Sequence, residues 1–358
     1  MVGSDNDVKF RSFLLLLLGL VLVATAPVVH AEGPAVSKLA ESLRPAWHIA
    51  HGFRNLSPTY DYPLGERVKR LLLGTLHGYP PRGPVPTPVV NHGEEVRANT
   101  TRPTLTWIGH ATFLVQLDGL NILTDPNWSD RASPLGFVGP KRLVPPGLRF
   151  EDLPHIDAVV ISHDHYDHLD APTVRRLAHH DHPTFFVPLG LKAWFARIGI
   201  DNVVELDWWE SRTMHGVTFA CTPAQHSSGR TLADHDERLW SSWVITSPDR
   251  RFFFAGDTGY DPDLKEIGRR FGPFDAAALP IGGYRAYEGK HPNHLNPEEA
   301  VQLFEDIGGR RLIPMHWGTF DMNREPFREP PDRLMKEAYR RGLEDRVTLL
   351  GPGQTVSW

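Results

Sequence analysis

Three histidines and two aspartates are crowded into the six residues from His163 to His168, directly after the apolar run 158–162. The apolar run predicts a buried β-strand, so these polar side chains are expected where that strand ends. Imidazole and carboxylate groups are the ligands that zinc and similar divalent ions take in proteins. The stretch therefore favours a metal site over a solvated surface loop, and it requires a sheet that holds the loop in place.

Short β-prone runs alternate with helical segments from residue 104 to the end of the chain. Strands are predicted at 105–108, 113–117, 120–124, 158–162, 203–206, 217–222, 240–246, 251–255, 276–280, 311–314 and 348–350. Helices are predicted at 171–179, 190–198, 262–271, 297–307 and 332–341, with one more at 68–76. Strands and helices in both halves predict an α+β fold in which two sheets pack together with helices outside, a four-layer sandwich.

Further polar residues follow other predicted strands. His110 and Asp125 come after two early strands, and His226, Asp257 and His316 come after three later ones. Strands of one domain can bring their ends together, whereas residues scattered over loops would rarely converge. We therefore expect these side chains to contribute to a single site.

The pattern His-x-His-x-Asp-His after a strand resembles the hallmark of the metallo-β-lactamase superfamily, and the remaining ligands of that family occur here in the same order. The resemblance implies the αβ/βα four-layer sandwich and two divalent ions, with zinc expected and iron or manganese left open. It implies one ion on His163, His165 and His226, and a second on Asp167, His168 and His316. Asp257 is then the carboxylate that bridges the two ions.

A closer resemblance links the chain to the branch of N-acyl-phosphatidylethanolamine-hydrolysing phospholipase D and its bacterial relatives. It runs from residue 103 to residue 320, and its motifs include 107–112, 139–142, 252–260, 270–275, 296–300 and 316–320. This branch implies a phospholipase D-like phosphodiesterase that acts on N-acyl ethanolamine phospholipids, with a hydroxide between the two ions as nucleophile. Ser227 departs from the pattern, because an aromatic residue is expected after His226.

The sequence also predicts roles for residues that do not belong to the ligand set. Asp125 is expected to accept a hydrogen bond from a metal-bound histidine and so to orient its ring. His110, Tyr166 and His294 are expected to contact the substrate. Catalytic roles are assigned to Asp167, Asp257 and His294, and His294 or Asp257 is the candidate source of the proton for the leaving alcohol.

Two other functions remain open at this point. The superfamily hosts many reactions on one site, so the substrate is alternatively a small ester, lactone or phosphoester. A non-catalytic metal-binding protein of the cell envelope is the second alternative. Its weakness is that every one of the seven ligand positions is filled by a ligand residue.

The first residues of the chain have the shape of a secretory signal. Lys9 and Arg11 precede an apolar run from Phe13 to Ala26, and the small residue Ala31 closes a cleavage-like tripeptide. We expect residues 1–31 to be removed and the protein to be exported to the periplasm; an uncleaved membrane anchor is the alternative. The remaining chain divides into a proline-rich extension, 32–102, that wraps the domain, and a hydrolase domain, 103–358.

Composition excludes several classes of protein. A content of 41% hydrophobic and 23% charged residues is typical of a soluble globular chain, and a formal net charge of -5 offers no basic field for nucleic acid. Cys221 is the only cysteine, so no intrachain disulfide forms. The expected partner is a phospholipid or small-molecule substrate, with peripheral membrane contact, and no oligomeric state follows from the sequence.

Overall fold

The computed structural model describes residues 45–58, 65, 83–231, 233–284, 293–320, 322 and 325–358. The predicted leader and the predicted helix at 68–76 lie outside these residues. Within the described part of the chain, no helix is both long enough and apolar enough to cross a membrane.

A mixed sheet of seven strands forms the first half of the fold, in the order β15-β3-β4-β5-β6-β7-β8. Strands β15, β3, β4 and β5 pair antiparallel, and β5 to β8 run parallel. The strands are β3 (Thr104–Gly109), β4 (Thr112–Leu117), β5 (Leu120–Thr124), β6 (Ala158–Val160), β7 (Thr184–Pro188), β8 (Val203–Leu206) and β15 (Thr355–Ser357).

A second sheet of six strands has the order β14-β13-β12-β11-β10-β9. Strands β9 to β12 pair antiparallel, and β12 to β14 run parallel. The strands are β9 (Ser211–Met214), β10 (Val217–Thr222), β11 (Ser242–Thr246), β12 (Arg251–Phe254), β13 (Ala276–Pro280) and β14 (Leu312–Met315). A separate two-stranded hairpin joins β1 (His48–Ile49) to β2 (Gly52–Phe53).

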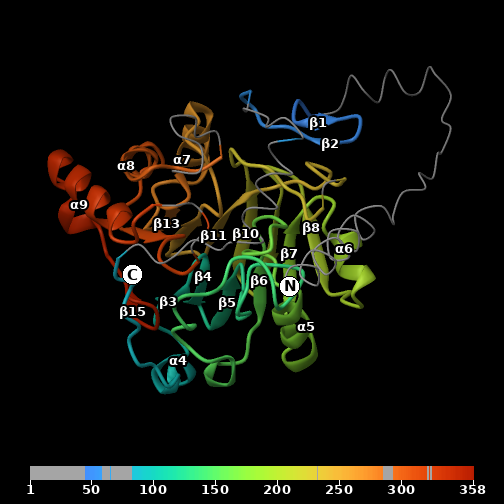
Figure 1. The fold of residues 1–358 in the computed structure, drawn as a ribbon, viewed down its shortest axis with the longest axis horizontal. Helices are drawn as coiled ribbons and strands as arrows, with labels where there is room; N and C mark the ends of the chain where they lie inside the picture. Colours follow the sequence, from blue (N-terminus) through green and yellow to red (C-terminus); the bar gives the residue numbers. More distant parts are fainter. Residues whose placement is uncertain are drawn as a thin grey trace, which may run out of the picture.

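Helices lie on both outer sides of the paired sheets. In Figure 1 the orange and red helices α7, α8 and α9 lie on one side of the molecule, and the green helices α5 and α6 lie on the other. This arrangement confirms the predicted sandwich. The helices are α4 (Glu94–Ala98), α5 (Ala171–His180), α6 (Lys192–Arg197), α7 (Lys265–Phe271), α8 (Pro297–Asp306) and α9 (Glu329–Arg341).

Alternating side chains of the first sheet explain why it is covered on both faces. In β4, Phe113 and Val115 belong to the core between the two sheets, whereas Leu114 belongs to the core under α5 and α6. Successive residues of a strand point to opposite faces, so a strand buried on both sides is apolar throughout. Phe186 of β7 stacks on Phe219 of β10 with 4.1 Å between ring centroids, which joins the two sheets directly.

The strand predictions were wrong at several places. The predicted strand at 348–350 is absent from the described structure, where Thr348 N–H only donates to the Leu312 carbonyl at 2.9 Å. The chain instead turns at 351–353 and pairs β15 with β3. Strands β7 and β9 were also missed. Most of β9 is exposed, so it carries no apolar alternation, and its pairing with β10 alone makes it a strand.

Candidate metal centre

The carboxyl ends of parallel strands from both sheets meet at one place. Asp125 follows β5, the 162–169 loop follows β6, Asp257 follows β12 and His316 follows β14. In parallel strands these ends lie on the same edge of the sheet, which is where open α/β sheets bind ligands. The two sheets therefore bring residues more than 150 positions apart into one buried cluster.

Asp125 holds the start and the end of the histidine-rich loop together. It is fully buried, and its carboxylate accepts hydrogen bonds from Ser162 N–H at 2.7 Å and from the Ser162 hydroxyl at 2.6 Å. It also accepts from His168 Nδ1 at 2.7 Å. A proton on Nδ1 leaves His168 Nε2 as the ring atom that can bind an ion.

The three-histidine cluster consists of His163, His165 and His226. His165 Nδ1 lies 2.9 Å from His163 Nε2 and 3.3 Å from His226 Nε2. The opposite nitrogen of two rings has another partner, because His163 Nδ1 lies 2.9 Å from the Ser162 hydroxyl and His226 Nδ1 donates to the Asn293 carbonyl at 2.8 Å. Three ring nitrogens thus converge on one point.

The carboxylate cluster consists of Asp167, His168, Asp257 and His316. His168 Nε2 lies 3.3 Å from Asp167 Oδ2 and 3.2 Å from Asp257 Oδ2, and His316 Nε2 lies 3.5 and 3.2 Å from the same two oxygens. Ligands about 2.0–2.1 Å from a tetrahedral ion stand about 3.3 Å apart, which these separations match. Asp257 Oδ2 is also 3.8 Å from His226 Nε2, so Asp257 lies between the two clusters.

Several buried polar atoms of these clusters have no hydrogen-bond partner among the described residues. They are His168 Nε2, both ring nitrogens of His316 and Asp257 Oδ1. A buried polar atom without a partner is costly, and such atoms in a native site call for an ion or a ligand. The donor set and the unpaired atoms fit a pair of divalent cations, one at each cluster.

The two clusters differ in their electrostatics. Burial, reinforced by the neighbouring histidines, holds the pKa of His163 well below its usual value, and burial likewise lowers the pKa of His226. Burial also opposes charge on His316, but Asp257 and Asp167 outweigh it and raise the His316 pKa to about 9. The same carboxylates raise the pKa of His168. Burial thus favours the neutral form of His163 and His226, whereas the carboxylate cluster attracts positive charge.

His110 lies against the carboxylate cluster. Its Nε2 is 2.9 Å from Asp167 Oδ2, and its ring centroid is 4.0 Å from that of His316. The backbone of His110 is held by Thr319 Oγ1, which accepts from its N–H at 2.7 Å, and its φ is 54°. The sequence assigned this residue to the substrate; the structure places it beside a candidate ligand, with 3% of its surface exposed.

His294 lies on the other side of the centre. Its Nδ1 is 3.8 Å from Asp257 Oδ2, and its ring centroid is 5.1 Å from that of His226. A side chain on Gly283 would meet His294 Nδ1 at 2.8 Å, so only glycine lets the ring lie there. Asn296, two residues later, caps helix α8. The residue is 8% exposed, and it forms one group of possible ion-holding donors with His226 and Asp257, so it borders the candidate centre.

Tyr166 faces a different neighbourhood. The Arg230 guanidinium lies 4.0 Å from the centroid of its ring, and its hydroxyl donates to the Arg230 carbonyl at 2.9 Å. Its expected substrate contact stays a prediction.

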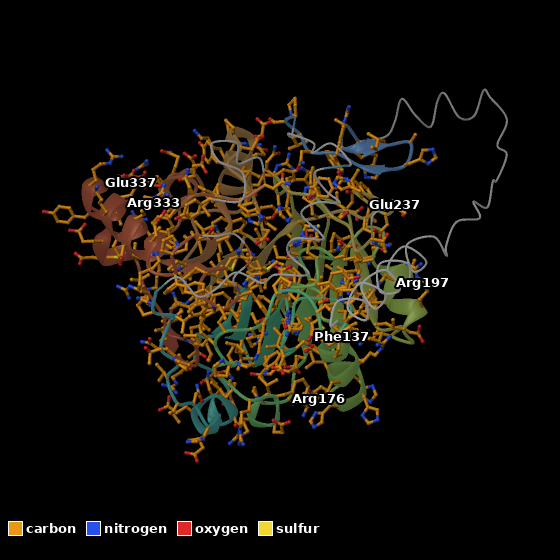
Figure 2. The ribbon with its side chains drawn as sticks, viewed as in Figure 1. Phe137, Arg176, Arg197, Glu237, Arg333 and Glu337 are labelled. Atoms are coloured by element: carbon orange, nitrogen blue, oxygen red, sulfur yellow. The ribbon has the colours of Figure 1, made fainter. Side chains whose placement is uncertain are left out.

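A pocket opens beside the carboxylate cluster. It is lined by His110, His316, Trp317, Gly318, Phe320, Met322, Glu325, Phe327 and Pro330. Arg142, from the loop between β5 and β6, lies with its guanidinium carbon 4.7 Å from the centre of the Phe320 ring. The same loop carries Phe137, which is 69% exposed on the surface of the molecule (Figure 2). A ligand of the centre can thus meet apolar as well as polar groups.

Sequence reasoning missed residues that hold the ligands without binding an ion. Ser162 and Asn293 each contact one ring of the three-histidine cluster, and Asn55 contacts the backbone of His226. Ser162 could have been suspected, because it directly precedes the histidine-rich stretch. Asn55 and Asn293 are single polar residues in loops, and no spacing in the sequence distinguishes them from other loop residues.

Comparison with known proteins agrees with this geometry. Residues 120–317 match the model of the Beta-lactamase superfamily domain. The chain therefore belongs to the metallo-β-lactamase superfamily and is a metal-dependent hydrolase of that superfamily. The resemblance noted in the sequence and the predicted fold class are both confirmed.

Individual relatives and a solved structure resemble the chain over most of its length. The chain is 48% identical over 241 residues to N-acyl-phosphatidylethanolamine-hydrolyzing phospholipase D 1 of Caenorhabditis elegans, covering 64% of this chain and 68% of the relative. It is 40% identical over 343 residues to an uncharacterized protein of Mycobacterium tuberculosis, covering 92% and 90%. Among solved structures, it resembles Igni18, a metallo hydrolase of Ignicoccus hospitalis, with 26% identity, a TM-score of 0.57 and coverage of 72% and 99%.

Proposed function

We propose that this protein is a phospholipase D-like phosphodiesterase that hydrolyses N-acyl ethanolamine phospholipids. The observation that carries the proposal is the 48% identity to the Caenorhabditis elegans phospholipase, in a chain that also assembles the two ligand clusters. In the proposed reaction, water adds to phosphorus and the bond from phosphorus to the ethanolamine oxygen breaks. The products are phosphatidic acid and an N-acyl ethanolamine, which leaves with a proton.

The seven side chains of the two clusters are the proposed ligands of two ions, with zinc as the expected metal. When bound, two divalent ions would lower the pKa of a shared water and offset the negative charge that develops on the phosphoryl oxygens. Asp257 is proposed to hold both ions, because its carboxylate lies between the clusters. Asp167 is proposed to hold the second ion, and its hydrogen bond with His110 fixes the carboxylate in place.

His294 is the proposed catalytic residue nearest the substrate. It lies 3.8 Å from Asp257, and its buried ring is held against the backbone of Gly283. From this place it can hydrogen-bond an oxygen of the phosphodiester. We therefore propose that it orients the phosphoryl group or the leaving alcohol.

Contact with a lipid surface is part of the proposal. The loop between β5 and β6 exposes Phe137 and Leu135 and also carries Lys141, which is exposed. Arg142, next to Lys141 in this loop, packs on Phe320, which lines the pocket beside the centre. Apolar side chains next to a cation suit the boundary between acyl chains and anionic headgroups. Export, directed by residues 1–31, would bring the protein to such a surface.

The direct test is hydrolysis of N-acyl phosphatidylethanolamine vesicles by the purified, zinc-loaded chain in water labelled with oxygen-18. We expect N-acyl ethanolamine to be released and the label to appear in phosphatidic acid, because water attacks phosphorus. Label in the N-acyl ethanolamine would mean that a carbon–oxygen bond breaks. Rapid hydrolysis of lactones or simple esters without cleavage of any phospholipid would contradict the proposal.

His294→Ala tests the substrate role separately. We expect turnover to fall by about 100-fold or more, as for the loss of one donor to a transition state, with both ions retained in elemental analysis. The exposed His179 on α5 is the matched control, and His179→Ala should leave turnover unchanged. Loss of an ion from the His294→Ala protein would make His294 a ligand and refute its assignment to the substrate.

A further inference from the structure

Residues 45–58 form a strap across the end of the second sheet, outside the span that matches the superfamily model. The strap contains the β1–β2 hairpin, drawn in blue in Figure 1. Trp47 Nε1 donates to Asp207 Oδ1 at 2.8 Å, and His48 Nε2 lies 2.8 Å from Asp207 Oδ2. Phe53 N–H donates to the Asp236 carbonyl at 2.8 Å. The strap is thus anchored to the turn after β8 and to the loop that carries His226.

Asn55 is the residue by which the strap reaches the candidate metal centre. Its side-chain nitrogen donates to the His226 carbonyl at 2.7 Å, and its side-chain oxygen accepts from the His226 N–H at 3.0 Å. The same oxygen accepts from Trp240 Nε1 at 2.9 Å. The His226 N–H and Trp240 Nε1 both donate to one end of the Asn55 amide, and the His226 carbonyl accepts from the other end. These partners determine which end is the oxygen. Asn55 is buried, with 9% of its surface exposed.

These contacts supply hydrogen bonds that the backbone of His226 makes nowhere else among the described residues. His226 is 2% exposed, so its N–H and carbonyl cannot rely on bulk water. Buried backbone groups are almost always paired, and here one side chain pairs both groups of one residue. The ring is held independently, because His226 Nδ1 donates to the Asn293 carbonyl. Backbone and ring together determine where His226 Nε2 points.

We propose that Asn55 is a positioning residue for the ion of the three-histidine cluster and acts through His226. This inference rests on the two-ion centre proposed above. The motif loop holds His163 and His165 two residues apart after one strand, whereas His226 comes from a separate loop. His226 is therefore the ligand of this cluster whose backbone the strap holds in register with the other two. The strap is part of the metal centre and not only a cover of the domain.

The test measures zinc content and zinc affinity of the full chain by competition with a chromogenic chelator. We expect Asn55→Ala to bind one ion about 10- to 100-fold more weakly and the other with unchanged affinity, the range seen when a partner that orients a ligand is removed. In a His226→Ala background, Asn55→Ala should add nothing to the loss, because Asn55 acts through the removed ligand. Additive losses in that background would overturn the proposal.

Three further variants separate positioning from folding. Asn55→Asp keeps the oxygen that accepts from His226 and Trp240 but places a carboxylate oxygen against the His226 carbonyl, and we expect it to weaken the same ion. If Asn55→Ala does not fold, as judged by circular dichroism, Asn55→Asp is the variant whose zinc affinity is measured. Arg54→Ala removes an exposed side chain of the strap that donates to the Ala46 carbonyl, and it should change nothing.

Asp207→Asn weakens the strap at its other anchor and leaves Asn55 intact, so we expect normal zinc affinity. An equal loss in Asp207→Asn and Asn55→Ala, or an equal loss of both ions, would show that the strap only stabilises the fold and would overturn the proposal. A wild-type chain with two ions and a folded Asn55→Ala protein with unchanged affinities would refute the role of Asn55 alone. A wild-type chain that binds no zinc would refute the metal centre and this role with it.

Discussion

The three-histidine cluster and the carboxylate cluster lie side by side but are held in place by different parts of the molecule. His163 and His165 share one loop, and their partner His226 is tied to the strap and to Asn293. In the carboxylate cluster, Asp125 orients His168 and His110 contacts Asp167, and both of these supports follow strands of the first sheet. One site depends on loops at the edge of the fold and the other on its central strands.

The difference has an electrostatic side as well. Three imidazoles bring no negative charge to an ion, so affinity depends on how well the rings are aimed. Asp167 and Asp257 supply charge to the carboxylate cluster, and the raised pKa of His316 records the same field. We infer that the three-histidine site is the more sensitive to distant structural changes, and that the carboxylate site is the more sensitive to pH.

Asp257→Ala should have the largest effect, because its carboxylate lies between both clusters. We expect loss of both ions in elemental analysis and a fall in turnover on the order of 1,000-fold or more. Asp263→Asn is the control, since Asp263 is exposed nearby on the turn before α7. Retention of one ion at full affinity would mean that Asp257 belongs to a single cluster.

Arg238→Met should come next, because it removes the cation that pairs with Asp164 and Asp234. Arg238 Nη1 lies 2.8 Å from Asp234 Oδ2 and 2.5 Å from Asp164 Oδ2, and its side chain is 10% exposed. Leaving buried carboxylates without their partner costs about 3–5 kcal/mol of unfolding free energy, measurable by denaturant titration. Asp164 lies inside the motif loop, so this support serves His163 and His165.

Acid titration sharpens that prediction. Burial tends to raise the pKa of Asp234, but hydrogen bonds from Arg238 and Thr231 outweigh it and lower the pKa below the ordinary 3.8. This stability is present above pH 3.8 and is lost as the pH falls through the lowered pKa. The wild type should lose this stability in acid, and Arg238→Met should lose less, because only the hydrogen bonds from Thr231 remain. Arg250→Met, at a pair 3.8 Å apart on the surface, should cost less than about 1 kcal/mol.

Asp125→Asn should weaken the carboxylate cluster most, because Asp125 bonds His168 directly and reaches His163 only through Ser162. The substitution alters the acceptor that orients His168 and the pairing of Ser162, and we expect about 10- to 100-fold lower affinity for one ion. Together with Asn55→Ala, it tests whether each cluster has its own support. Chelator competition gives both affinities. If both variants weakened the same ion, the separation of the two clusters drawn here would be wrong.

The smallest effect is a difference in proton release. His316, with a pKa of about 9, carries a proton at neutral pH that an ion must displace. Zinc affinity of the carboxylate cluster should therefore rise about tenfold per pH unit for each proton between pH 7 and 9 and level off above it. His163 and His226, whose pKa values are lowered by burial, should add no such slope at the three-histidine cluster.

Calorimetry in buffers of different ionisation enthalpy separates the two clusters. His226→Ala leaves the carboxylate cluster, and His316→Ala leaves the three-histidine cluster. We expect at least one proton to be released per zinc in the first variant and none in the second. Equal release from both variants would remove the electrostatic distinction between the two sites.

Strands with strong apolar periodicity could be predicted from the sequence, as could the convergence of polar residues at their ends. The strands β8, β10 and β13 have the predicted bounds, because their runs are apolar and closed by turn residues. The edge strands β9 and β15 could not be predicted, since what makes them strands is a neighbour in space. The sequence pattern likewise could not predict that His110 lies beside Asp167, because this contact depends on how β3 lies relative to the motif loop.

The sequence by itself determined the chemistry of this protein: the imidazoles and carboxylates, their crowding after an apolar strand, and the superfamily to which they point. The tertiary structure alone decided which nitrogen of each ring faces the centre and which residues hold it there. Ligand type is a property of single residues and their local order. Ring orientation comes from hydrogen bonds between segments far apart in the chain, such as Asn55 with His226, and the free energy of such contacts exists only once the sheets have packed.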